Sequence, residues 1–179
     1  MKRLPTFFVA AILIGSLCSS CNTKKDDDDD MTLPDLTATL EVTGAVNASY
    51  NFTNPENGGS NVVHGMICNF SSGNNLFAIS GLNTAYTYAV ACSMPGVQTG
   101  TFSITSANYG HIDGSQTMGF PELLSGSINI TSAQVLWSVG ASTVYSVSGS
   151  WSVTLTDGEN PPSTITFTGQ FTNLAVTAS

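Results

Sequence analysis

The chain ends in two long runs of alternating residues, Val144–Thr156 (VYSVSGSWSVTLT) and Ser163–Val176 (STITFTGQFTNLAV). The segment Asp157–Pro162 (DGENPP) joins them. Apolar and aromatic residues recur at nearly every second position, which is the period of a strand with one buried face. Gly, Asn and Pro in the connecting segment are typical of a turn. The two runs therefore predict a long β-hairpin at the end of the chain.

Two details of this hairpin predict its packing. The apolar positions of the last run change parity near Thr172–Asn173, which indicates a β-bulge that shifts the register without losing core contacts. Gly149 and Gly169 interrupt the strands where a bend or a bulky neighbour needs space. Trp151 lies on the apolar face of its run, and we expect it in the core.

The same alternation continues upstream through most of the chain. Strand-like segments are predicted over residues 37–43, 46–52, 62–70, 76–80, 86–92, 101–105 and 126–131, and a hairpin over 109–120 that turns at Asp113–Gly114. A short helical turn is predicted over 121–124, and no other segment indicates a helix. The sequence therefore predicts one all-β domain over 37–179, an antiparallel β-sandwich or flattened β-barrel of about ten strands.

The N-terminus has the pattern of a secretory signal. Lys2 and Arg3 precede an almost wholly apolar run from Phe7 to Leu17. That run has about 11 residues, whereas a membrane-spanning helix needs about 20. Residues 1–20 are therefore predicted to be a signal peptide that is removed from the mature protein.

The residues after this run resemble the lipobox of bacterial lipoproteins. Ser19 and Ser20 are small residues that precede Cys21, as the signal peptidase requires, although Cys18 stands where leucine is usual. The resemblance implies that Cys21 carries the lipid and becomes the new N-terminus. The alternative is ordinary cleavage near Ser20, which would leave a soluble secreted protein.

A dense block of charge follows the cysteine: Lys24, Lys25 and then Asp26–Asp30. Such a block repels itself and is expected to remain a disordered tether, here predicted over 21–36. Lysine and acidic residues just after the lipidated cysteine resemble the export signal of Bacteroidetes-type surface lipoproteins. The resemblance implies a protein of the outer membrane that faces the medium, with the periplasmic face as the alternative.

The composition of the rest of the chain excludes several function classes. No lysine or arginine follows Lys25, and seven acidic residues lie between Met31 and Ser179, so this part of the chain carries a charge of about −7 at neutral pH. Without basic side chains it has no cationic patch for nucleic acid, nucleotides or anionic lipid headgroups. No Gly-x-Ser-x-Gly motif and no pair of carboxylates at catalytic spacing is present. We expect no enzyme, no cofactor and no metal site.

Five residues are singled out for possible roles in the fold or in binding. Cys68 and Cys92 are candidates for a disulfide in an oxidising compartment, and the alternative is two buried free thiols. Trp137, Tyr109 and Phe120 are the candidate ligand contacts, because aromatic rings serve as platforms for sugars or apolar molecules. Each of the three rings is individually more typical of a core residue.

The last 80 or so residues resemble a group of small Bacteroidetes-type lipoproteins of uncharacterised function. The matching segments are Thr99–Ile104, Gly126–Thr131, Ser148–Trp151 and Phe167–Asn173, which follow the pattern GxxxIT … SGTFxF … GxFxN. The resemblance implies a β architecture and lends no catalytic residue.

Two functions follow from these observations. The first is a surface-exposed, non-enzymatic lipoprotein with a structural or interaction role, held to the membrane by its N-terminal lipid and with an unspecified protein partner. The alternative is an accessory protein of a nutrient-uptake system that binds a glycan or a small apolar ligand. A solvent-facing cluster of Trp137, Tyr109 and Phe120 would favour binding, and burial of all three would favour the first function.

Overall fold

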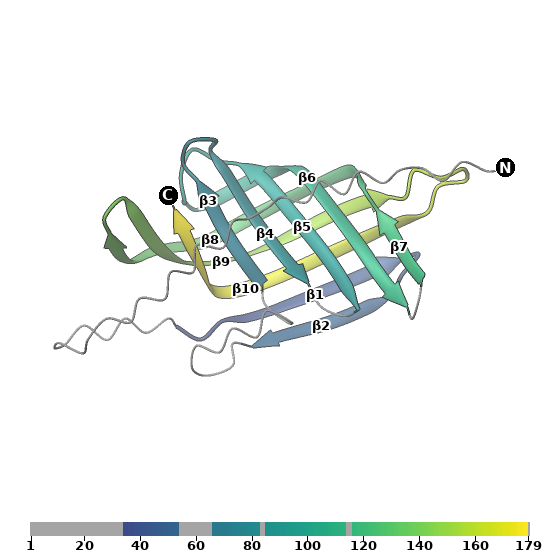
Figure 1. Ribbon diagram of the computed structural model, residues 1–179, viewed down its shortest axis with the longest axis horizontal. Helices are drawn as coiled ribbons and strands as arrows, with labels where there is room; N and C mark the ends of the chain where they lie inside the picture. The colour runs from purple at the N-terminus through teal and green to yellow at the C-terminus, as the bar shows by residue number, and fades with distance from the viewer. Residues whose placement is uncertain (1–33, 54–65, 83–84, 114–115, 179) are drawn as a thin grey trace. The chain divides into compact units, whose positions relative to one another are not determined.

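The computed structural model describes residues 34–53, 66–82, 85–113 and 116–178, and these residues form an all-β domain without a helix (Figure 1). Its ten strands are β1 Thr37–Gly44, β2 Ala48–Thr53, β3 Met66–Ser71, β4 Leu76–Leu82, β5 Tyr86–Ser93, β6 Gly100–Asp113, β7 Gln116–Phe120, β8 Glu122–Val139, β9 Ser142–Thr156 and β10 Thr164–Ala178. The predicted signal peptide, Cys21 and the acidic run lie outside the described residues.

Seven of the strands close into a barrel in the order β10-β3-β4-β5-β6-β8-β9, with β9 pairing back to β10. In Figure 1 the teal strands β3 to β6 cross the long strands β8, β9 and β10. Outside the barrel, β1 and β2 extend the sheet from β10, and β7 pairs with β6. Of the two predicted architectures, the flattened barrel is confirmed.

Closure of the barrel depends on a change of neighbour along β10. The first part of β10 pairs with β1, and its last residues, Val176–Ala178, run parallel to Cys68–Phe70 of β3. This parallel pair departs from the predicted antiparallel sheet. The β-bulge predicted near Thr172–Asn173 is confirmed at the point of change, where the register shifts and Asn173 has a φ of 60°.

Asn173 also joins three segments at this point. Its backbone N–H donates to Ser148 Oγ of β9 at 3.1 Å, and its side-chain Nδ2 donates to the carbonyl oxygen of Asp35, just before β1, at 3.2 Å. Asparagine tolerates the left-handed conformation better than other non-glycine residues do. One residue therefore supplies both the unusual backbone geometry and hydrogen bonds from β10 to β9 and to the segment that leads into β1.

The predicted hairpin of the last two strands is confirmed, with Trp151 opposite Gly169 and Gly149 opposite Phe171. Trp151 is buried, as predicted. A Cβ atom placed on Gly169 would lie 2.0 Å from Cζ2 of the Trp151 ring. The ring therefore occupies the space that any other side chain at position 169 would need, and the close approach requires glycine there.

The prediction for residues 121–131 is wrong in one respect. Instead of a helical turn followed by a short strand, the chain forms one 18-residue strand, β8, from Glu122 to Val139. β9 offers β8 a partner along this whole length, and three register shifts absorb the irregular positions. A continuous ladder satisfies more backbone groups than an isolated helical turn would.

The core fills the space enclosed by the barrel and the β1–β2 hairpin. Its fully buried large side chains are Tyr86, Tyr88, Tyr109, Phe77, Phe120, Phe167, Leu40, Ile79, Met94, Ile128, Leu155 and Ile165. Burial alternates along β5, as its period-two pattern predicts. The interior is thus occupied by side chains from all parts of the described chain.

Candidate functional site

The three aromatic residues predicted as ligand contacts do not form a common surface. Tyr109 and Phe120 face each other across β6 and β7 and are 2% and 1% exposed. Trp137 lies on the distal part of β8, opposite Val144 of β9, and is partly buried. The prediction is therefore wrong for Tyr109 and Phe120, which pack in the core, and only Trp137 has an exposed part.

Aromatic rings fill the barrel where a ligand would otherwise enter. The Tyr88 ring lies between those of Tyr86 and Trp151, with a centroid distance of 6.0 Å on each side, and Phe167 lies 6.2 Å from Tyr88. Phe171 continues the stack, 5.7 Å from Trp151. Offset and tilted rings at these separations attract one another in addition to the gain from burial. The stack is therefore a packed core.

Burial keeps the tyrosine hydroxyls of this core in their neutral form. It raises the pKa of Tyr86 to about 12 and raises the pKa values of Tyr88 and Tyr109 further. The Tyr109 hydroxyl lies 3.4 Å from Nδ1 of His111, and their rings stack. The Tyr88 hydroxyl has no hydrogen-bond partner among the described residues. None of these hydroxyls is poised to ionise near neutral pH.

Cys68 and Cys92 are both buried free thiols, so the predicted disulfide is not formed. Their positions explain why. Cys68 of β3 pairs with Ile79 of β4, and Cys92 of β5 pairs with Phe77 of β4, so one strand separates them. Two strand spacings are about 9.5 Å, whereas a disulfide needs Cα atoms within about 7 Å.

The two thiols are also unreactive at neutral pH. Burial raises the pKa of Cys92 to about 11 and, together with the nearby Cys92, raises the pKa of Cys68 well above its ordinary value. Because the thiolate is the reactive form, neither residue is an activated nucleophile at neutral pH. Their role in this structure is to pack in the core.

The acidic turn between β9 and β10 is held by its own hydrogen bonds. Asp157 Oδ1 accepts from the backbone N–H groups of Glu159 at 3.1 Å and Ser163 at 2.9 Å. The same two bonds lower the pKa of the Asp157 carboxyl. No group of three His, Cys, Asp or Glu residues in the described part of the chain is placed to hold a metal ion. The carboxylate of Asp157 therefore stabilises the turn, because it accepts two backbone hydrogen bonds within it.

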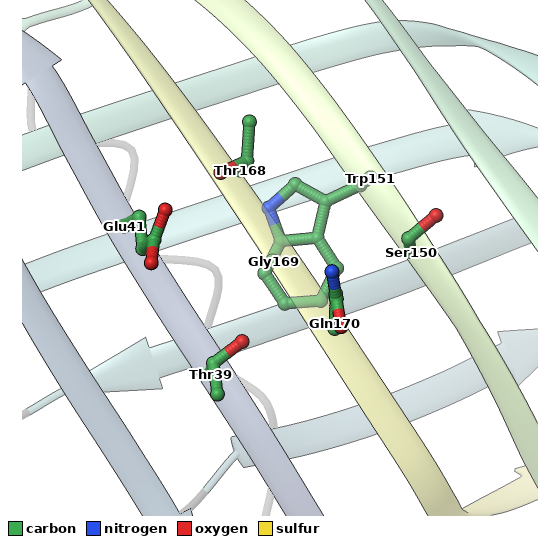
Figure 2. A pocket seen from close by; sticks show the side chains of 7 residues that line it. All are labelled: Thr39, Glu41, Ser150, Trp151, Thr168, Gly169 and Gln170. Carbon is green, nitrogen blue, oxygen red and sulfur yellow. The ribbon is translucent and has the colours of Figure 1, made fainter.

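A shallow polar depression lies on the outer face of the sheet formed by β1, β10 and β9 (Figure 2). It has a volume of about 500 Å³ and is lined by Thr39, Glu41, Ser150, Trp151, Thr168, Gly169 and Gln170. Figure 2 shows Trp151 crossing Gly169, with hydroxyl, amide and carboxylate groups around it. The depression offers hydrogen-bonding groups and one negative charge to a small polar ligand.

A second exposed feature is the distal part of β8, in which Trp137 is the one residue predicted as a ligand contact. Val135 and Val139 are among the most exposed large apolar side chains of the described residues. They lie two positions on either side of Trp137, in a stretch without charged residues. The absence of charge is the sequence feature that could have pointed to this exposed stretch. The alternating pattern alone does not distinguish an exposed strand from a buried one.

Comparison with known proteins gives no relative: no family model, no curated protein and no solved structure matches this chain. Within the described residues, no helix is long and apolar enough to cross a membrane. The fold and the geometry of the sites above are therefore what bears on function.

Proposed function

We propose that this protein is a lipid-anchored, non-enzymatic domain of the outer membrane that faces the medium and acts through its outer surface. The observation that carries the proposal is the filled interior of the barrel. Rings of Tyr88, Trp151, Phe167 and Phe171 occupy the enclosed space and contact one another. Barrels that carry lipophilic ligands keep that space open.

The membrane location rests on the residues before the domain. Cys21 follows two small residues in a lipobox-like context, and Lys24–Lys25 precede the run Asp26–Asp30. A lipid on Cys21 would anchor the chain, and a charged tether would hold the barrel away from the bilayer. The negative domain and an anionic membrane surface repel each other, which favours an extended tether.

The tether makes a sharp test possible, because no lysine or arginine follows Lys25. Trypsin added to intact cells is expected to cut at Lys24 and Lys25 and to release the whole domain into the medium. A variant with Asp26–Asp30 replaced by alanine keeps both cleavage sites. We expect this variant to be cut only after the cells are lysed, because it lacks the acidic part of the export signal.

One outcome would contradict the location, and another would contradict the role of the aspartates in export. If the wild-type domain is released only after lysis, the protein faces the periplasm. If the alanine variant is released from intact cells as readily as wild type, the aspartates are a spacer and not a signal. Immunoblotting of medium and cell fractions, with a periplasmic protein followed in parallel, measures both.

The polar depression favours one second function, the binding of a neutral saccharide. Its hydroxyl and amide groups suit sugar hydroxyls, and Glu41 disfavours anionic sugars. We expect neutral soluble polysaccharides in a native gel to retard the protein. The double variant Thr39→Ala/Gln170→Ala should lose this retardation, whereas Thr172→Ala, at an exposed position of β10 outside the depression, should keep it. Equal migration of all three proteins with and without polysaccharide would rule this function out.

A further inference from the structure

Among the residues that the structure describes, no strand lies beside one edge of β8 over the last part of its length. On that edge β6 pairs with β8 only through the four residues Gly100–Ser103, and this ladder ends at Ile130. From Thr131 to Val139, the pairing found among the described residues is with β9 on the opposite edge. About every second residue of this stretch of β8 thus presents its backbone N–H and C=O groups to the outside, while the residues between them bond to β9.

The chemistry of this edge differs from that of ordinary exposed edges. Natural sheets protect such edges with charged residues, especially lysine, or with proline. Here no charged residue occurs from Leu123 to Thr156, and no proline either. Val135 and Val139 are 59% and 62% exposed, and the partly buried Trp137 lies between them. The edge therefore combines unsatisfied backbone groups with exposed apolar side chains.

We propose that this edge pairs with the same edge of a second copy of the chain, antiparallel and about a two-fold axis near Val135. The domain carries seven acidic residues and no basic one from Met31 to Ser179, so two copies repel each other where carboxylates meet. None of these carboxylates lies between Leu123 and Thr156, so the β8–β9 hairpin brings no charge into the contact. The proposal rests on the proposed function, because it names the partner of the outer surface.

The register shift between Val135 and Trp137 fits such an axis. With Leu136 as the extra residue of the bulge in both copies, Val135 faces its own counterpart and Gln134 faces Trp137. A further shift between Ile130 and Ser132 limits the ladder to a short stretch. Because β9 already occupies the other edge of β8, the pairing uses the single free edge and closes at two copies.

A strand is a better occupant of this edge than a lipid bilayer. Hydrocarbon cannot hydrogen-bond the free N–H and C=O groups, and each group buried there without a partner costs several kcal/mol. A second β8 satisfies them through ladder hydrogen bonds. Lipid anchoring would confine all copies to one membrane surface and raise their effective concentration, so a short ladder suffices.

Cysteine crosslinking of the full chain in its own membrane tests this proposal. In Val135→Cys, the two introduced cysteines would face each other across the axis, within the Cα separation that a disulfide allows. Oxidation with copper(II) phenanthroline should convert this variant mainly to a dimer on a non-reducing gel. Leu124→Cys is the matched control, since Leu124 lies on the same strand and is 58% exposed. The Leu124→Cys variant should give no more crosslinked dimer than the wild-type protein does.

A second variant tests the edge itself. Adding Val139→Lys to Val135→Cys should abolish the dimer, because a lysine on an exposed edge blocks strand pairing in natural sheets, while the near-ultraviolet circular dichroism of the folded domain stays unchanged. A monomeric Val135→Cys, equal dimer from Leu124→Cys, or crosslinks to a different protein would overturn the proposal. So would quenching of a bimane label on residue 135 by brominated phospholipids, which would place the edge in the bilayer. Release by trypsin is scored separately, so failure of the dimer leaves the surface location standing.

Discussion

Gly169→Ala is expected to destabilise the domain by about 3 kcal/mol or more, as overpacking of a filled core does. The added Cβ would lie 2.0 Å from Cζ2 of Trp151, well inside contact distance. The ring has nowhere to move, because Tyr88 lies on one side of it and Phe171 on the other. Urea unfolding followed by tryptophan fluorescence would measure the loss as a lower midpoint.

Gly119→Ala is the matched control for this substitution. Gly119 lies in β7, and nothing is within 4 Å of an added Cβ there. The control should change stability by less than about 0.5 kcal/mol, as exposed substitutions usually do. The double variant Gly169→Ala/Trp151→Ala should cost less than the sum of the single variants, since the clash is gone. Strict additivity would show that the ring and the glycine do not share the space.

The second large effect is expected in alkali. Unfolded tyrosine ionises near pH 10, whereas the folded pKa of Tyr86 is about 12 and those of Tyr88 and Tyr109 are higher still. Above pH 10 the folded state therefore binds more protons than the unfolded state, and stability falls as pH rises. We expect a loss of about 2–4 kcal/mol per pH unit between about pH 10 and 12, because each buried tyrosine contributes up to about 1.4.

Tyr88→Phe separates this effect from general damage at high pH. The Tyr88 hydroxyl is buried without a hydrogen-bond partner among the described residues, so its removal should leave the neutral-pH stability unchanged or slightly higher. The variant has one fewer ionising group, so its stability should fall less steeply in alkali. Urea midpoints from about pH 9 to 12 provide the comparison. Identical slopes for the variant and wild type would mean that Tyr88 ionises in the folded state.

The same packing bears on the proposed function. Three buried tyrosine rings that stay neutral at neutral pH, two buried free thiols, and a glycine with a tryptophan ring against it describe a closely packed body. A closely packed, acidic barrel on a charged tether suits a protein that presents a surface. The two surfaces it offers are the polar depression around Gly169 and the free edge of β8, and the experiments above address them independently.

The local structure of this protein follows from its residue pattern. Its period-two alternation predicts the hairpin of β9 and β10, the burial of Trp151 and the bulge at Thr172–Asn173, because side chains alternate between the two faces of a strand. The glycine opposite a large ring was also predictable, since a gap in an apolar pattern marks a place where space is needed. All of these features depend on neighbours within one strand or one hairpin.

The remaining features depend on contacts between strands that are far apart in the chain. Tyr109 and Phe120 carry the pattern of any half-buried strand, and only barrel closure places both in the interior. Closure itself depends on three residues of β10 beside β3, about a hundred positions apart in the chain. The free edge of β8 beyond Ile130 arises because β6 begins only at Gly100, opposite Ile130. An alternating strand has the same sequence pattern whether its edges are paired or free, because pairing joins backbone groups that every residue carries.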